Sequence, residues 1–327
     1  MSKCQVKKTH KEKTTDRKLK NEQLVVLTKS LKIKEKINIS WKVVNKINEC
    51  GTWMEFLSDR KLEHFKLYQG LFCDNRFCPI CSKRKSMKDA VELKMITEYI
   101  QQELNREFIM VTFTAPNVTG ENLDKEIVKY NKALDKLFKR KKYKDSVKGY
   151  VRKLETTYNN NKKSKSYGTY HPHFHVLISV DKSYFKGGKY IKREDWLKDW
   201  QEVMNDNTIT QVDVRRQKTK TKDTIDGGIL EITKYIAKDS NYLVSEEVFQ
   251  YFYKGLKGKR QYSYGGDFKD AREKLKNGEL EKYRPKDETE WYWKVTYKWD
   301  KKRYTEERKA LSEKELKQLK ELQKSEE

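Results

Sequence analysis

The sequence predicts an α+β fold in which helices pack on an antiparallel sheet. Short apolar runs rich in β-branched residues are typical of strands, whereas apolar residues that recur at helical spacing are typical of helices. From residue 108 onwards these segments follow in the order strand, helix, strand, strand, helix, strand. A polar loop joins the two consecutive strands, which indicates a hairpin and therefore antiparallel pairing.

Length, charge and cysteine content narrow the class of protein. The 327 residues suffice for one large or two modest domains. Lys and Arg number 74 against 49 Asp and Glu, a formal net charge of +25, and 12% of the residues are aromatic. Such a surface suits a polyanion with unpaired bases, although charge also serves general solubility. Five cysteines do not make a disulfide framework, and no secretory signal or membrane-spanning run is found, which indicates a reducing cytoplasm.

Changes in composition divide the chain into four predicted segments. Residues 1–44 read as a flexible basic arm, which either contacts DNA phosphates or is simply solvated. Residues 45–90 form a cysteine-rich module, residues 91–270 carry the α+β domain, and residues 271–327 add a C-terminal strand and helix.

The cysteine-rich module predicts a structural zinc site. Cys73, Cys78 and Cys81 follow a C-x4-C-x2-C spacing, and Cys50 lies upstream as a fourth ligand, with His64 as its substitute. The short turn between the last two cysteines presents two thiolates to one tetrahedral ion. The alternative is that these cysteines are buried as small apolar side chains.

Hydrophobic periodicity places the elements of the main domain. The run over 108–114 is an apolar, β-branched strand of the buried kind, and the strand over 149–158 is joined by a polar loop to the strand over 171–180. The remaining predicted elements are helices over 86–105, 122–144 and 193–204 and a strand over 211–215.

The strand over 171–180 has a chemical face. Alternation places His171, His173 and His175 on one side, opposite an apolar side. Neutral imidazoles two residues apart bind one divalent cation, so we expect His173 and His175 to be metal ligands. Glu155 on the paired strand is a candidate third ligand if the hairpin register turns it toward the histidines, and His171 competes with it.

A second chemical stretch spans residues 228–242. At helical spacing its isoleucines lie on one side, and Glu231, Tyr235 and Lys238 lie on the other, with Tyr242 joining them if the helix continues. Such a stripe is commonly a solvated face. Beside a metal, however, Tyr235 is a candidate nucleophile toward a phosphodiester, Lys238 a cation that activates it and Glu231 a general base.

Two elements are predicted in the C-terminal segment. Trp291–Trp299 alternates in the manner of a strand that packs on a core. A capping box at Ser312 and Glu315 starts a short amphipathic helix with leucines at 316, 319 and 322, of the kind that docks on a core or pairs with a second copy.

Taken in order, these motifs resemble a known family. The strand over 108–114, the sequence His171-Pro-His-Phe-His-Val-Leu177 and the spacing of Glu231, Tyr235 and Lys238 resemble the rolling-circle replication initiators of small Gram-positive plasmids. These are HUH endonucleases with a single catalytic tyrosine. The cysteine-rich region and the stretch Arg260–Phe268 are similar to further segments of that family, so the likeness covers about residues 45–270.

The resemblance implies a fold, an activity and partners. The fold would be a central five-stranded antiparallel sheet flanked by helices. Tyr235 would nick one strand at the double-strand origin, leaving a 5′-phosphotyrosine and a 3′-hydroxyl primer, and Glu231 would let termination proceed by hydrolysis. His173 and His175 would hold Mg²⁺ or Mn²⁺. Origin DNA, a host helicase and a polymerase would be the partners, in the bacterial cytoplasm.

Two other functions fit parts of the sequence. A transposase or relaxase would use the same HUH chemistry, in some cases with two tyrosines, but Tyr242 lies seven residues after Tyr235 rather than in a tight pair. A non-catalytic, zinc-containing DNA-binding regulator would account for the charge and the cysteines. It would leave the histidine face and the Glu-Tyr-Lys stripe unexplained.

Overall fold

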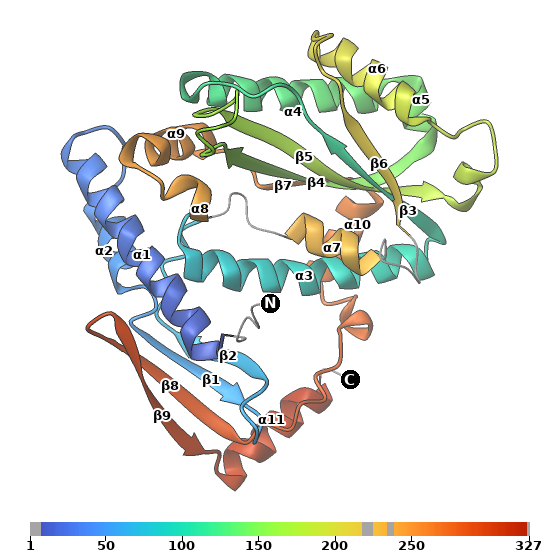
Figure 1. The fold of residues 1–327 in the computed structure, drawn as a ribbon. Coiled ribbons are helices and arrows are strands. Elements are labelled where there is room, and N and C mark those ends of the chain that lie inside the picture. Colours follow the sequence, from blue (N-terminus) through green and yellow to red (C-terminus); the bar gives the residue numbers. More distant parts are fainter. Residues whose placement is uncertain (1–7, 218–224, 234–238, 326–327) are drawn as a thin grey trace, which may run out of the picture. The chain divides into compact units, whose positions relative to one another are not determined.

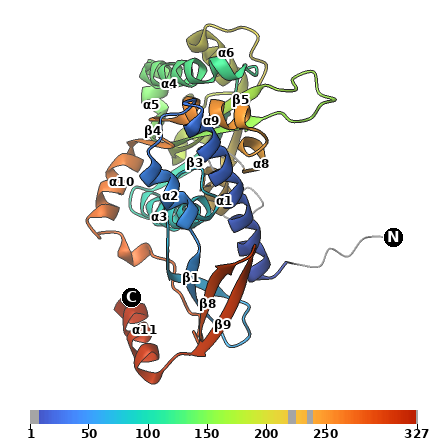
Figure 2. The same ribbon diagram turned by 90° about the vertical axis from the view of Figure 1, so that its left-hand side faces the viewer.

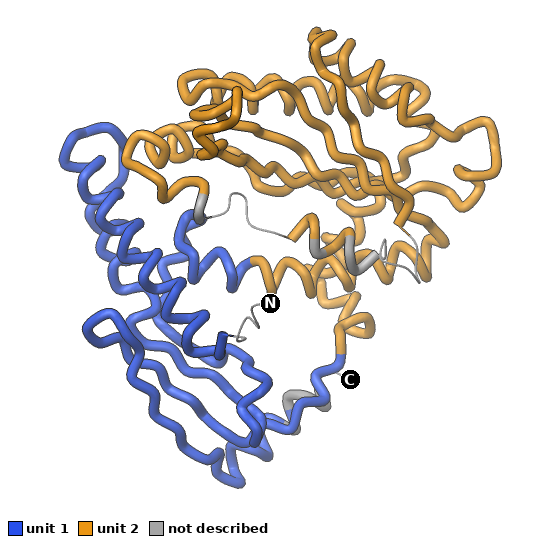
Figure 3. Tube along the Cα trace, viewed as in Figure 1, with its two compact units in different colours: residues 1–85, 286–327 blue, residues 86–285 orange. Residues whose placement is uncertain are grey.

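The computed structural model describes residues 8–217, 225–233 and 239–325 (Figure 1). The chain forms two compact units (Figure 3). Unit 1 consists of residues 1–85 together with 286–327, and unit 2 consists of residues 86–285. Within the described ranges, no helix is both long enough and apolar enough to cross a bilayer.

Unit 2 is built on a five-stranded antiparallel sheet in the order β6-β3-β5-β4-β7. The predicted α+β class with a central five-stranded sheet is therefore confirmed. β5 lies in the middle, where a strand needs apolar side chains on both faces, and Phe174, Leu177 and Ile178 are all fully buried. The strands are β3 (Arg106–Phe113), β4 (Val147–Tyr158), β5 (Tyr170–Asp181), β6 (Val212–Gln217) and β7 (Tyr262–Gly266).

Helices cover both faces of this sheet (Figure 1). On one face Phe174 of β5 packs edge-on against Tyr130 of α4, and Phe113 of β3 packs against Trp200 of α6. On the other face α3, α7 and α10 enclose a second core that contains Leu177 of β5. The helices are α3 (Pro79–Gln102), α4 (Leu123–Lys139), α5 (Lys141–Ser146), α6 (Arg193–Met204), α7 (Ile225–Thr233), α8 (Asp239–Tyr242), α9 (Glu246–Leu256) and α10 (Asp267–Lys276).

Unit 1 contains a four-stranded antiparallel sheet in the order β2-β1-β8-β9, so strands from distant parts of the sequence lie side by side (Figures 1 and 2). β1 pairs with β8 along its whole length, from Trp53 opposite Lys298 to Ser58 opposite Trp293. The elements are α1 (His10–Ile33), α2 (Trp41–Glu49), β1 (Trp53–Ser58), β2 (Phe65–Gly70), β8 (Trp293–Asp300), β9 (Arg303–Ala310) and α11 (Glu313–Ser325).

The two units differ from the four segments expected from the sequence. Residues 10–33 form a regular helix, α1, rather than a flexible arm. A capping box between Thr9 and Glu12 starts this helix, because each side chain accepts a backbone N–H of the other residue. β8 and β9 complete the sheet that β1 and β2 begin, so residues 286–327 belong with the cysteine-rich module.

The predicted C-terminal helix is present as α11. The backbone N–H of Ser312 donates to Glu315 at 2.9 Å, and the N–H of Glu315 donates to the Ser312 hydroxyl at 3.3 Å, as the capping box requires. Leu316 and Leu319 pack against a small core that includes Leu57 of β1. In this structure α11 therefore docks on the sheet of its own unit.

Candidate active site and metal centres

The β4–β5 hairpin brings three metal-binding side chains together. Its register places Glu155 directly opposite His173, so both side chains project from the same face of the sheet. Oε2 of Glu155 lies 3.8 Å from Nε2 of His173 and 3.4 Å from Nε2 of His175. The three side chains are only 8% to 12% exposed. The geometry therefore makes Glu155 the third member of this cluster.

His171 lies outside the cluster. Its ring stacks near that of His173 with centroids 5.2 Å apart, and a hydrogen bond ties it to the backbone of Ala115. The hairpin register thus places Glu155, and not His171, in the third position of the cluster. The sequence alone did not determine this register.

Hydrogen bonds at the second ring nitrogen orient both histidines. Nδ1 of His173 lies 3.2 Å from the backbone carbonyl of His171. Nδ1 of His175 lies 3.0 Å from Oε1 of Glu231 and 3.3 Å from the hydroxyl of Thr112. A proton on each Nδ1 satisfies these oxygens and leaves both Nε2 lone pairs facing Glu155, which is the arrangement of histidines that bind a metal.

Burial and charge set the protonation of the cluster. Burial, helped by the neighbouring His175, lowers the pKa of His173 to about 4, so this imidazole is neutral near pH 7. Burial alone would lower the pKa of His175, but the carboxylates of Glu155 and Glu231 outweigh it and raise that pKa. Burial would likewise raise the pKa of Glu155, but its contacts with His175, His173 and Lys153 outweigh burial and lower that pKa.

The donor set fits a divalent cation. One ligand atom from each of Glu155, His173 and His175 lies within 4.8 Å of the others. Two imidazoles and one carboxylate leave coordination positions for other ligands, as metal sites that act on a substrate do. Oxygen and nitrogen donors in this ratio suit Mn²⁺, whereas Mg²⁺ prefers oxygen donors.

α7 carries Glu231 to this site. Ile229 and Ile232 anchor the helix in the core on the histidine side of the sheet. Gly228 allows close contact with β6, since a Cβ at this position would lie 2.8 Å from the side-chain oxygen of Gln217. Glu231 of the same helix reaches His175 and also lies 3.4 Å from Arg215.

Hydrogen bonds also fix the end of α7. The hydroxyl of Tyr262 donates to the carbonyl of Ile232 at 3.2 Å, and the hydroxyl of Ser86 donates to the carbonyl of Thr233. Tyr235 and Lys238, the predicted nucleophile and its cation, lie outside the described residues.

Tyr242 does not belong to the site. It is 2% exposed and packs between Phe249 and Phe252, with ring centroids 6.3 Å and 6.0 Å away. Its burial in this aromatic core gives it a structural role. Tyr242 was expected to join the Glu231 stripe only if the helix continued that far; in the structure its ring belongs to this aromatic core.

A second cluster lies in unit 1, where four thiols converge. Cys50 Sγ lies 3.5 Å from both Cys78 Sγ and Cys81 Sγ, and Cys73 Sγ lies 3.7 Å from Cys81 Sγ. A zinc ion with Zn–S bonds of about 2.3 Å spaces its sulfurs by about 3.8 Å at tetrahedral geometry. All four cysteines are free thiols. The sulfur positions therefore fit a tetrathiolate zinc site.

His64 is not a ligand of this cluster. It lies on the turn between β1 and β2, where its Nδ1 is 3.3 Å from Oδ2 of Asp59. The cluster is complete without it.

Sequence reasoning missed Thr112 and Arg215 as neighbours of the site. Thr112 lies directly opposite His175 in the β3–β5 pairing, and Arg215 projects from β6 toward Glu231. Both positions follow from strand order. The alternation of β3 and β6 would reveal them only once these strands are known to lie beside β5.

Comparison with known proteins assigns the chain to a family. The sequence model of the family described as Replication protein matches residues 64–306. Protein rep of Staphylococcus aureus is 44% identical over 201 residues, which span 61% of this chain and 84% of that protein. Protein rep of Lentilactobacillus hilgardii is 37% identical over 247 residues, which span 72% of this chain and 76% of that protein. No solved structure matches the chain. The resemblance noted in the sequence is thus confirmed, and the chain belongs to the replication protein family, the Rep initiators of plasmid replication.

Proposed function

We propose that this Rep protein initiates rolling-circle replication by nicking one strand at the double-strand origin of its plasmid. The observation that carries the proposal is the buried cluster of Glu155, His173 and His175, with Glu231 in contact with it. A divalent cation, Mn²⁺ or Mg²⁺, held there would polarise the non-bridging oxygens of the scissile phosphodiester.

Tyr235 is the proposed nucleophile. Its phenolic oxygen forms a bond to phosphorus while the bond from phosphorus to the 3′ oxygen breaks. The phenolic proton leaves, and the 3′ oxygen takes up a proton to become the primer hydroxyl. The pKa of a free tyrosine is about 10, so a nearby cation such as Lys238 is needed to favour the phenolate. The product is a 5′-phosphotyrosine.

Glu231 is the proposed general base of termination. It precedes Tyr235 by one helical turn in the sequence, and its carboxylate contacts both His175 and Arg215. Proton removal from a water or from a second hydroxyl would let the displaced strand be released or rejoined. Arg215 offers a guanidinium to the DNA phosphate, because its side chain is 43% exposed.

A covalent-adduct assay tests this proposal. The protein is incubated with Mn²⁺ and single-stranded oligonucleotides that cover the origin of its own plasmid, and adducts are resolved on denaturing gels. Wild type should form an adduct that requires the metal, and Tyr235→Phe should form none. Tyr242→Phe is the matched control, since it keeps the buried ring and should leave the adduct unchanged.

Other outcomes point to the other functions. Tight binding without an adduct on any oligonucleotide would favour a non-catalytic DNA-binding regulator. An adduct that survives Tyr235→Phe and disappears with Tyr242→Phe would assign the attack to the second tyrosine. The burial of Tyr242 argues against a two-tyrosine transposase or relaxase.

We also propose that Cys50, Cys73, Cys78 and Cys81 hold a structural Zn²⁺. Metal analysis of protein purified without added metal should give one zinc per chain. A host helicase and a polymerase remain predicted partners, and the bacterial cytoplasm remains the predicted location. Pull-down with labelled protein from a host extract tests the partners.

A further inference from the structure

A buried lysine lies beside the cysteine cluster. Lys18 of α1 is 1% exposed. Its Nζ donates to the carbonyls of Cys50 at 2.8 Å and Asn48 at 2.9 Å and to Oδ1 of Asn21 at 2.9 Å. In the described part of the chain, no carboxylate lies within ion-pair distance of it. A buried ammonium whose hydrogen-bond partners are all neutral is costly, so its presence requires an explanation.

Asn21 connects this lysine to the cluster. It lies one turn further along α1 and is fully buried. Its Nδ2 donates to Sγ of Cys78 at 3.4 Å and to the carbonyl of Ile47 at 3.0 Å, while its Oδ1 accepts from Lys18. All of its polar atoms are therefore used, and one of its bonds goes directly to a ligand sulfur.

The charge of a filled cysteine site would add a negative partner close to Lys18. Four thiolates around a divalent zinc ion carry a net charge of −2, and three of these cysteines are buried. Removing such a charge from water is unfavourable unless hydrogen bonds and opposite charge surround it. Burial lowers the pKa of Lys18, and the nearby Cys50, Glu22, Cys78 and Cys73 act against this by favouring the ammonium.

We propose that Lys18 and Asn21 of α1 stabilise a zinc tetrathiolate in unit 1, so that α1 and the metal hold each other in place. Lys18 supplies the buried positive charge and Asn21 the N–H···S hydrogen bond. The inference rests on the zinc site proposed above and is independent of nicking.

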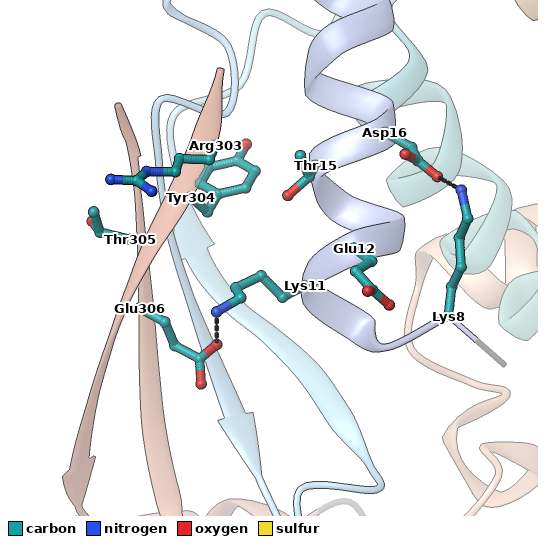
Figure 4. A pocket seen from close by; sticks show the side chains of 9 residues that line it. All are labelled: Lys8, Lys11, Glu12, Thr15, Asp16, Arg303, Tyr304, Thr305 and Glu306. Carbon is teal, nitrogen blue, oxygen red and sulfur yellow. Dashed lines mark hydrogen bonds and ion pairs between the residues drawn. The ribbon is translucent and has the colours of Figure 1, made fainter. Parts of the chain in front are cut away.

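The contacts at the first turns of α1 are weaker. At its first turn, His10 stacks on Phe65 with ring centroids 4.1 Å apart. Beyond it, a groove of about 580 Å³ separates α1 from β9 (Figure 4). Lys11 and Glu306 bridge this groove with a partly exposed ion pair, which contributes little. In the middle of the helix, Lys18 and Asn21 are buried together with apolar residues such as Leu24 and Val25.

Zinc release from the full-length protein tests the proposal. The variants are Lys18→Met, which keeps the length of the side chain, and Asn21→Leu. Lys29→Met, at an exposed position of the same helix, is the control. With a chromogenic chelator in excess, both test variants should release zinc about tenfold faster or more than the control, the usual effect of removing a group that supports metal ligands.

A spectrum separates this role from a general loss of packing. With Co²⁺ in place of zinc, the sulfur-to-cobalt charge-transfer band should move to longer wavelength in Lys18→Met and in Asn21→Leu, because sulfur electrons are held less tightly without the positive charge or the hydrogen bond. Release rates and bands equal to those of Lys29→Met would overturn the proposal. So would wild-type protein that contains no zinc, which would remove the site without bearing on the adduct assay.

Discussion

The cysteine cluster of unit 1 and the histidine–glutamate cluster of unit 2 differ in how many ligands the chain supplies. Four thiols converge in unit 1, whereas two imidazoles and one carboxylate converge in unit 2. A closed set of four is typical of structural zinc, and an incomplete set leaves room for a substrate oxygen. The count of protein ligands thus separates a site that holds the fold from one suited to chemistry.

The groups that surround the two clusters also differ in their exposure to solvent. The cysteine cluster is bounded by fully buried polar groups of α1, Lys18 and Asn21. The histidine cluster is bounded by Glu231, which connects it to the partly exposed Arg215. Buried polar groups therefore lie beside the cysteine cluster, whereas a partly exposed arginine connects the histidine cluster to solvent.

Loss of a thiol should have the largest effect on stability. Cys78→Ser removes one of the four ligands, and structural zinc contributes on the order of 10 kcal/mol at neutral pH. We expect zinc loss and a strongly lowered melting transition, measured by metal analysis and circular dichroism. If the variant melts like wild type, the cluster is not a structural metal site.

Loss of a histidine should leave stability nearly intact and remove activity. His173→Ala is expected to lower the cleavage rate by about a hundredfold or more, since it removes a ligand of the cation that stabilises charge at phosphorus. The melting temperature should change little compared with Cys78→Ser. If His173→Ala and Cys78→Ser each lost both stability and cleavage activity, the two clusters would not have separate structural and chemical roles.

Glu231→Gln should have an intermediate and diagnostic effect. The carboxylate orients His175 through Nδ1, so its loss is expected to weaken Mn²⁺ binding about 10- to 100-fold. Titration with Mn²⁺ should restore the first nick at high metal concentration, while release of the product strand stays slow if Glu231 is also the base of termination. If high Mn²⁺ restored both the first nick and release of the product strand, the role of Glu231 would be limited to orienting His175.

The identity of the metal should have the smallest effect. Because two of the three ligands are imidazoles, Mn²⁺ should support adduct formation at lower concentration than Mg²⁺. Half-saturating concentrations of the two metals, measured in the same assay, check this. Equal values would indicate that oxygen atoms of DNA, rather than the histidines, dominate binding.

Local patterns predicted several elements of unit 2, although the helix expected over 122–144 is divided at Arg140 into α4 and α5, and α9 and α10 were not predicted. α6 occupies Arg193–Met204 as expected, and β5 extends only one residue beyond each end of the predicted strand. The contact between Glu155 and His173 was a hypothesis, because a slip of one residue in the hairpin would reverse the direction of Glu155. The polar loop between the two strands does not fix that register.

Unit 1 was harder to predict for two physical reasons. α1 carries Lys18 and Asn21 on its buried side, so its inward face has no continuous apolar stripe and was interpreted as a solvated arm. β1 finds its partner β8 far away in the sequence, and no local signal specifies that pairing. Both features depend on tertiary structure. The cysteine spacing predicted the candidate zinc ligands but neither of these features.

The pairing of β1 with β8 also sets the order in which the protein is completed during synthesis. The ribosome makes α1, the four cysteines and β1 first, yet the third and fourth strands of their sheet emerge only after all of unit 2. Until then β1 has one open edge, which pairs readily with other chains. A message that stops after residue 285 would therefore leave two of the four strands of this sheet unmade, and aggregation of the nascent product would be its signature.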